Sequence, residues 1–218
     1  PTGLPFNSVI ALELHGGKPL SPLVNAGAIA TTSLINAENV EQRWQRILHI
    51  QQQLAGEQVA LSDEVNQSEQ TTNFHNRAIA WLLYSAGYLY CDAMEACDVY
   101  TRQCSTLLNT VELATLGATL AAGGVNPLTH ERVLQADNVP YILAEMMMEG
   151  LYGRSGDWAY RVGLPGKSGV GGGILAVVPG VMGIAAFSPP LDEEGNSVRG
   201  QKMVASVAKQ LGYNVFKG

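Results

Sequence analysis

The segment from Gly163 to Phe187 constrains the fold more than any other part of the sequence. It begins with the glycine-rich stretch GLPGKSGVGGG and continues into two short β-favouring runs on either side of Pro179-Gly180, a pattern typical of a β-hairpin. A two-stranded hairpin is marginally stable by itself, so further elements must pack against it. The only other weak candidate strand is SVIALELH, residues 8–15, so the predicted sheet lacks members.

The chain before this segment is mainly helical by pattern. Apolar residues recur at helical spacing in several stretches, at residues 38–56, 71–87, 91–105 and 136–151. Asn109, with Glu112 three residues later, is typical of the start of a further helix. Helices therefore account for most of the sequence up to the hairpin.

The sequence predicts an α+β fold made of two parts in one continuous domain. The first part is a mainly helical lobe over residues 1–153, and the second, residues 154–218, holds the β-hairpin and a closing helix. The closing helix is expected over residues 196–212, with Asn196 or Ser197 as its cap.

Composition excludes several classes of function. Hydrophobic residues make up 46% of the chain and charged residues 15%, which indicates a compact globular protein. A net charge of -6 argues against nucleic acid or an anionic membrane as a partner, and the most apolar run, residues 173–187, is too short to span a membrane. Cys91, Cys97 and Cys104 lack the spacing of a metal site, so we expect free thiols, no bound metal and a cytoplasmic protein.

The Gly-Lys-Ser triplet at residues 166–168 does not fit a nucleotide-binding loop. A P-loop requires glycine where Arg161 stands, and the dinucleotide-binding motif requires glycine where Ile174 stands. The remaining functional interpretation is a lysine and a hydroxyl on a pocket-lining strand, as in the K-T-G element of penicillin-recognising serine enzymes. Such a strand can donate a backbone N–H to an oxyanion. A plain glycine-rich turn with an exposed Lys167 stays open as the alternative.

A set of motifs gives the chain a specific resemblance. They are FNS (residues 6–8), NAGAI (25–29), NRAIAWLL (76–83), DVYTRQCS (98–105), MMMEGLYGRSGDWAYRVG (146–163) and RVGLPGKSGVGGGI (161–174). In this order and over nearly the whole length, the chain resembles the bacterial serine-type glutaminases, which are similar to β-lactamases in fold and hydrolyse L-glutamine to L-glutamate and ammonia. The resemblance implies a β-lactamase-like serine hydrolase fold, L-glutamine as a small-molecule substrate, no cofactor, and a homo-oligomer (dimer or tetramer).

Four residues acquire substrate-binding roles through this resemblance. Asn25 of the N-A-G-A motif would contact the substrate, although such an asparagine is by itself more often a helix cap. Glu69 would face the α-ammonium of glutamine, and Asn76 would hydrogen-bond its α-carboxylate or amine. Tyr100 matches the binding tyrosine of the family. Taken alone, these side chains are ordinary polar residues of helices.

The reacting end of the substrate is assigned to the region around the Gly-Lys-Ser triplet. Tyr152 resembles the tyrosine that hydrogen-bonds the substrate and relays protons near the nucleophile, so it is the catalytic residue of the set. Val170 matches the strand residue whose backbone N–H supplies an oxyanion donor. Lys167 and Ser168 are expected to support the rim of the site, with their individual roles left open.

The sequence departs from the family at the nucleophile. The family uses the serine of an S-x-x-K motif upstream of the segment that matches Pro1, and this chain has no counterpart there. Its one S-x-x-K, Ser206 to Lys209, lies within the closing helix and is interpreted as chance. The chain thus resembles the C-terminal majority of a longer enzyme, lacking N-terminal strands and the nucleophile helix, and is predicted to be inactive alone. The alternatives are another penicillin-recognising-type serine hydrolase or an inactive fragment.

Overall fold

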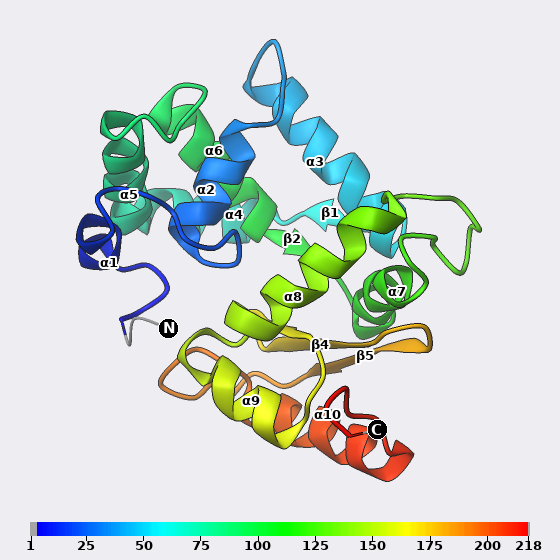
Figure 1. Cartoon of the computed structure of the whole chain (residues 1–218). Coiled ribbons are helices and arrows are strands. Elements are labelled where there is room, and N and C mark those ends of the chain that lie inside the picture. Colours follow the sequence, from blue (N-terminus) through cyan, green and yellow to red (C-terminus); the bar gives the residue numbers. More distant parts are fainter. Residues whose placement is uncertain (1–3, 218) are drawn as a thin grey trace. The chain divides into compact units, whose positions relative to one another are not determined.

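The computed structural model describes residues 4–217 (Figure 1). These residues divide into two compact units. Unit 1 takes in residues 4–51 and 58–107, and unit 2 takes in residues 52–57 and 108–217. This division follows packing, whereas the boundary expected at residue 153 follows the change from helical to β-type sequence. Each unit is described by itself.

Unit 1 is helical with one very short ladder. Its elements are α1 (Val9–Leu14), α2 (Asn25–Ser33), α3 (Val40–Ala55, which enters unit 2 at Gln52), β1 (Ala60–Leu61), α4 (Asp63–Thr72), α5 (Phe74–Ser85), α6 (Ala93–Cys104) and β2 (Thr106–Leu107). Buried residues of α2, α5 and α6 form the main core, including Ile29, Ile79 and Leu83. The amphipathic pattern of residues 38–56 is confirmed, because Trp44 and Ile47 of α3 are buried against Val99 of α6.

The weak candidate strand at residues 8–15 is wrong, because this segment is helix α1. The Oγ of Ser8 accepts the N–H of Ala11 at 3.1 Å, which caps the helix, and Leu12 is buried in the core of unit 1. The β-branched residues Val9 and Ile10 favour a strand locally, but the cap and the burial of one helical face determine the outcome.

Unit 2 contains the three-stranded sheet. Its elements are α7 (Thr110–Ala121), η1 (Ala136–Asn138), α8 (Val139–Glu149), η2 (Tyr152–Arg154), α9 (Ser155–Arg161), β3 (Gly166–Ser168), β4 (Gly173–Val178), β5 (Met182–Phe187) and α10 (Val198–Leu211). The strand order is β3-β4-β5, with both pairs antiparallel. The predicted hairpin is confirmed, with Val178 opposite Met182 and Gly180 at a φ of +74° in the turn.

Helices cover both faces of the hairpin, which resolves the problem of its marginal stability. Alternate residues Ile174 and Ala176 of β4 share a buried cluster with Val204 of α10. On the other face, α7 lies so close that a Cβ on Gly183 of β5 would sit 2.3 Å from the carbonyl oxygen of Ala114. Because side chains alternate across a strand, the sheet is the middle layer between α7 and α10. The predicted α+β architecture is confirmed.

Three helix ends match the sequence expectation closely. Asn109 and Glu112 form a reciprocal capping box at the start of α7. The closing helix α10 is capped by Ser197 and ends at Gly212, which adopts a left-handed φ of +74°.

Across residues 4–217, none of the helices combines the length and the apolar character that crossing a membrane requires.

The close contact between α7 and β5 predicts a sharp difference between two glycines of unit 2. Gly183→Ala should lower the stability by about 2 kcal/mol, because the new methyl group meets backbone atoms that must move. Gly156→Ala is the matched control, since its Cβ would meet nothing within 4 Å and alanine favours the helix α9. Thermal denaturation should show a fall of about 5 °C for Gly183→Ala and no fall for Gly156→Ala. Equal melting temperatures would contradict this packing.

Candidate active site

The structure brings together two of the predicted substrate-binding residues of unit 1. Asn25 is the first residue of α2 and Asn76 lies in the first turn of α5, 51 positions later, yet Asn25 Nδ2 donates to Asn76 Oδ1 at 2.7 Å. Both side chains are half-buried. An asparagine has one acceptor oxygen and one NH₂ group, so this bond leaves Asn25 Oδ1 to accept and the Asn76 amide to donate. The pair can therefore bind a group that carries both donors and acceptors.

The N-A-G-A motif explains why Asn25 has this position. A Cβ on Gly27 would lie 1.9 Å from the carbonyl oxygen of Ser21, so glycine is required for the preceding loop to cross α2 closely. The cap position belongs to Val24, which makes no side-chain cap bond. The helix-cap interpretation of Asn25 is therefore wrong, and its side chain is available for other contacts.

Asn73 orients the segment that carries Glu69 and Asn76, and sequence reasoning missed it. The stretch at 71–87 was expected to be one helix, but it breaks at Asn73 between α4 and α5. The Asn73 N–H donates to the Glu69 carbonyl at 2.9 Å, and its buried side chain donates to Thr101 Oγ1 at 2.9 Å. Asparagine is disfavoured inside helices, which is the one local signal that the sequence offered, but the bond to Thr101 spans 28 positions and no local pattern indicates it.

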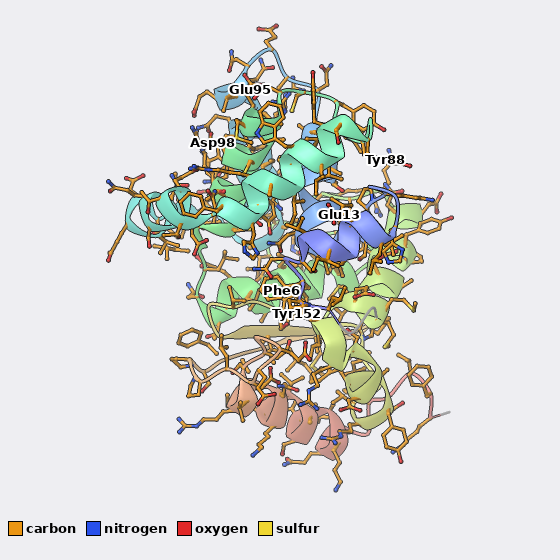
Figure 2. All side chains as sticks on the ribbon, turned by 90° about the vertical axis from the view of Figure 1, so that its left-hand side faces the viewer. Phe6, Glu13, Tyr88, Glu95, Asp98 and Tyr152 are labelled. Atoms are coloured by element: carbon orange, nitrogen blue, oxygen red, sulfur yellow. The ribbon has the colours of Figure 1, made fainter. Side chains whose placement is uncertain are left out.

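Glu69 and Tyr100 lie on two helices of unit 1 that are joined by hydrogen bonds. Gln70 Nε2 of α4 donates to Asp98 Oδ1 of α6 at 2.6 Å, and Asp98 also pairs with Arg102 at 3.0 Å. The Glu69 side chain is exposed at the last turn of α4, whereas Tyr100 is only 8% exposed. Figure 2 shows Asp98 and Glu95 on α6. The Gln70–Asp98 bond joins this end of α4 to α6, and the exposed carboxylate of Glu69 can meet a cation from solvent.

Tyr152 has an unusual backbone conformation in unit 2. It lies where the chain leaves α8 (Figure 2), is 9% exposed, and has a left-handed φ of +53°. Such a φ costs a residue with a side chain about 1 kcal/mol, so surrounding contacts must hold it. The Ser155 hydroxyl does so, because it accepts the Leu151 N–H at 3.0 Å and donates to the Tyr152 carbonyl at 2.9 Å.

Lys167 lies beside Tyr152 and is half-buried on strand β3. Its Nζ is 3.5 Å from the Tyr152 hydroxyl, lies 4.5 Å from the ring centroid, and donates to the Ser168 carbonyl. The alternative of an exposed lysine on a plain turn is therefore wrong. A phenol next to an ammonium group forms a donor–acceptor pair that can pass a proton to or from a bound ligand.

Ser168 is an interior anchor of unit 2 and is only 2% exposed. Its N–H donates to the Gly150 carbonyl at 3.0 Å, and its hydroxyl donates to Asn196 Oδ1 at 2.5 Å. The end of α8 approaches β3 so closely that a Cβ on Gly150 would lie 1.7 Å from the Gly166 carbonyl oxygen. The Gly-Lys-Ser triplet thus presents its lysine toward Tyr152 and fixes its serine inside the fold.

Val170 lies in a turn and not on a strand, which corrects the sequence-based expectation. Strand β3 ends at Ser168, and the turn is closed by the Gly172 N–H donating to the Gly169 carbonyl at 2.9 Å. The Val170 side chain is 56% exposed. Within residues 4–217 its N–H donates to no acceptor, so it can bind an oxygen atom of a ligand.

Over the described residues, no cluster of histidine, cysteine and carboxylate side chains could hold a metal ion. The three cysteines are free thiols.

Comparisons with known proteins give one consistent answer. A family model described as Glutaminase matches residues 1–216. Glutaminase 1 of Escherichia coli (strain K12) is 99% identical over 218 residues, which are 100% of this chain and 70% of that protein. A solved structure described as a probable glutaminase ybaS has a TM-score of 0.98 at 99% identity and covers 100% of this chain and 71% of its own.

A more distant solved structure adds a ligand. It is described as the covalent complex between the Bacillus subtilis glutaminase YbgJ and 5-oxo-L-norleucine, formed by reaction of that protein with 6-diazo-5-oxo-L-norleucine. Its TM-score is 0.87 at 31% identity, over 97% of this chain and 79% of that chain. The chain therefore has the fold of these structures.

Cys97 is buried and Cys104 is exposed, so we predict that an alkylating reagent reacts with the two thiols at different rates. Burial raises the pKa of the Cys97 thiol to about 11, whereas Cys104 is exposed. Only the thiolate reacts, and at pH 8 a thiol with this pKa is ionised to about one part in a thousand. Brief treatment with iodoacetamide should label Cys104 in the native protein and Cys97 only after denaturation, as read by peptide mass spectrometry. Equal labelling of both in the native state would disprove this environment.

Proposed function

The chain belongs to the glutaminase family, and we propose that its site residues bind L-glutamine and take part in its hydrolysis to L-glutamate and ammonia through a serine acyl-enzyme. The nucleophilic serine is one that this chain does not supply, because its single S-x-x-K, Ser206 to Lys209, lies inside helix α10. The observation that carries the proposal is the hydrogen bond between Asn25 and Asn76, which pairs two amides for amino-acid recognition.

In this proposal the amino-acid end of glutamine is bound by Asn25, Glu69, Asn76 and Tyr100. The α-ammonium group is a donor only and meets the Glu69 carboxylate and Asn25 Oδ1. The α-carboxylate is an acceptor only and meets the NH₂ group of Asn76, with Tyr100 as a further contact. Because Asn25 donates to Asn76, it keeps an oxygen for the ammonium group, and Asn76 keeps an NH₂ group for the carboxylate. The pair thus suits the two opposite charges of an α-amino acid.

In this proposal the reacting end of glutamine is served by Tyr152, Lys167 and Val170. The serine oxygen attacks the side-chain amide carbon, and the carbonyl electrons move onto oxygen, which accepts the Val170 N–H. The proton of the serine hydroxyl passes through Tyr152, with Lys167 alongside, to the amide nitrogen. The carbonyl then re-forms, the C–N bond breaks and ammonia leaves. Water then cleaves the γ-glutamyl ester, which releases glutamate. The covalent complex of the Bacillus subtilis relative supports a covalent intermediate in the family.

We also propose a cytoplasmic location and a homo-oligomeric state for the protein. Three free thiols suit a reducing compartment. Exposed apolar side chains of α5, such as Phe74 and Trp81, suit contact with another subunit.

The role of Glu69 predicts a specific kinetic change. In full-length glutaminase 1 of E. coli, numbered as in this chain, Glu69→Gln should raise the KM for glutamine about 10- to 100-fold, because the ammonium group loses its charged partner. Glu64→Gln is the matched control, since Glu64 is an exposed carboxylate at the other end of α4. An ammonia-release assay over a range of glutamine concentrations measures both. A normal KM for Glu69→Gln would remove this assignment.

The oxyanion role of Val170 rests on its backbone, so two substitutions separate backbone from side chain. Val170→Pro removes the N–H and should lower kcat about 100-fold or more, while Val170→Ala keeps the N–H and should lower kcat less than about threefold. Circular dichroism should confirm that both variants are folded. Similar kcat values for the two variants would contradict a donor at this position.

A further inference from the structure

Asn196 is a fully buried residue, 0% exposed, whose side chain is not used in capping α10. Sequence analysis left Asn196 or Ser197 as the cap. The structure assigns the cap to Ser197, whose Oγ accepts the Gly200 N–H at 3.1 Å. The Asn196 amide instead points into unit 2, where an uncompensated polar group would be costly. Its hydrogen bonds therefore indicate what it does.

The Asn196 side chain bridges two separate segments of unit 2. Its Nδ2 donates to the Leu151 carbonyl at 3.3 Å and to Asp192 Oδ1 at 3.4 Å, and its Oδ1 accepts the Ser168 hydroxyl at 2.5 Å. The Leu151 and Asp192 oxygens can only accept, so the NH₂ group must face them. The amide orientation follows, and the Ser168 hydroxyl must be the donor to Asn196.

Both ends of this bridge adjoin the predicted proton-transfer pair. Leu151 directly precedes Tyr152, and Ser168 directly follows Lys167. The bridge thus connects the two backbone segments on which the 3.5 Å separation of Tyr152 Oη and Lys167 Nζ depends. Tyr152 has a strained φ of +53°, so its orientation needs such external restraint.

Asp192 in turn orients Asn196. Its Oδ1 accepts the Asn196 N–H at 2.9 Å, its backbone N–H donates to the Asn196 carbonyl at 2.8 Å, and its Oδ2 accepts Gln201 Nε2 at 3.0 Å. The loop that carries Asn196 is therefore held at both ends before any substrate binds. A preorganised support of this kind keeps reacting groups at a fixed distance.

We propose that Asn196 is a positioning residue of the glutaminase reaction. By bridging Leu151 and Ser168, it holds Tyr152 and Lys167 at a fixed separation. The inference rests on the proposed role of Tyr152 in proton transfer. Asn196 is fully buried and acts through Leu151 and Ser168, which are the chain neighbours of this pair. Its loss should therefore affect the chemical step more than substrate binding, because its side-chain hydrogen bonds lead to the neighbours of Tyr152 and Lys167 and not to the residues assigned to the amino-acid end.

The test uses full-length glutaminase 1 of E. coli, numbered as in this chain. Asn196→Ala and Ser168→Ala each remove one side of the bridge and should lower kcat about 10- to 100-fold, with KM for glutamine changed less than about threefold. Ser197→Ala is the matched control: it lies in the same buried loop and lowers stability by removing the cap of α10, but it leaves the bridge intact. Its kcat should stay within about twofold of the parent enzyme.

A double-mutant cycle with Tyr152→Phe separates positioning from general destabilisation. If Asn196 acts through the Tyr152 hydroxyl, Asn196→Ala should lower kcat no further once that hydroxyl is gone. If Asn196→Ala does not fold, Ser168→Ala carries the same cycle, because it removes the hydroxyl with almost no change in volume.

Three outcomes would overturn the inference. They are an unchanged kcat for the folded bridge variants, a loss in Ser197→Ala equal to theirs, or fully multiplicative losses in the cycle with Tyr152→Phe. Normal turnover by Tyr152→Phe alone is a distinct result. It would overturn the proposed function of Tyr152, and the positioning role with it.

Discussion

The close approach of α8 to strand β3 is the contact on which the arrangement of Tyr152 and Lys167 in unit 2 depends. The Gly166 carbonyl occupies the space that a Cβ on residue 150 would fill, so only glycine fits there. This close approach lets the Gly150 carbonyl accept the Ser168 N–H. This contact fixes the starting point of the segment that leads to Tyr152 and the strand that carries Lys167. Any larger residue at 150 would separate the two, whatever the rest of the fold did.

Local signals in the sequence were sufficient for much of the architecture. The β-favouring runs around Pro179 predicted the hairpin, and Asn109 with Glu112 predicted the start of α7, because each pattern acts over a few residues. Where the outcome depended on a distant partner, local reasoning failed. The helix break at Asn73 depends on Thr101, which is 28 positions away, and the burial of Asn196 depends on Ser168, also 28 positions away.

The candidate site shows the same division between local and distant information. Neither Asn25 nor Asn76 has a neighbourhood that marks it as a ligand contact, and only the family motifs selected both. Their hydrogen bond across 51 positions is a property of the packed core of unit 1. Val170 illustrates a different error, because the glycine-rich run was interpreted as a strand at a residue that sits in a turn.

The left-handed backbone of Tyr152 has a consequence for how this protein can evolve. Glycine is the residue that tolerates a φ of +53° without steric cost, yet glycine has no hydroxyl. If Tyr152 has the proposed role in proton transfer, selection for thermal stability and selection for turnover favour different residues at this position. The tyrosine at this position therefore keeps a hydroxyl at the expense of backbone strain. Substitutions designed to stabilise the protein should leave Tyr152 unchanged.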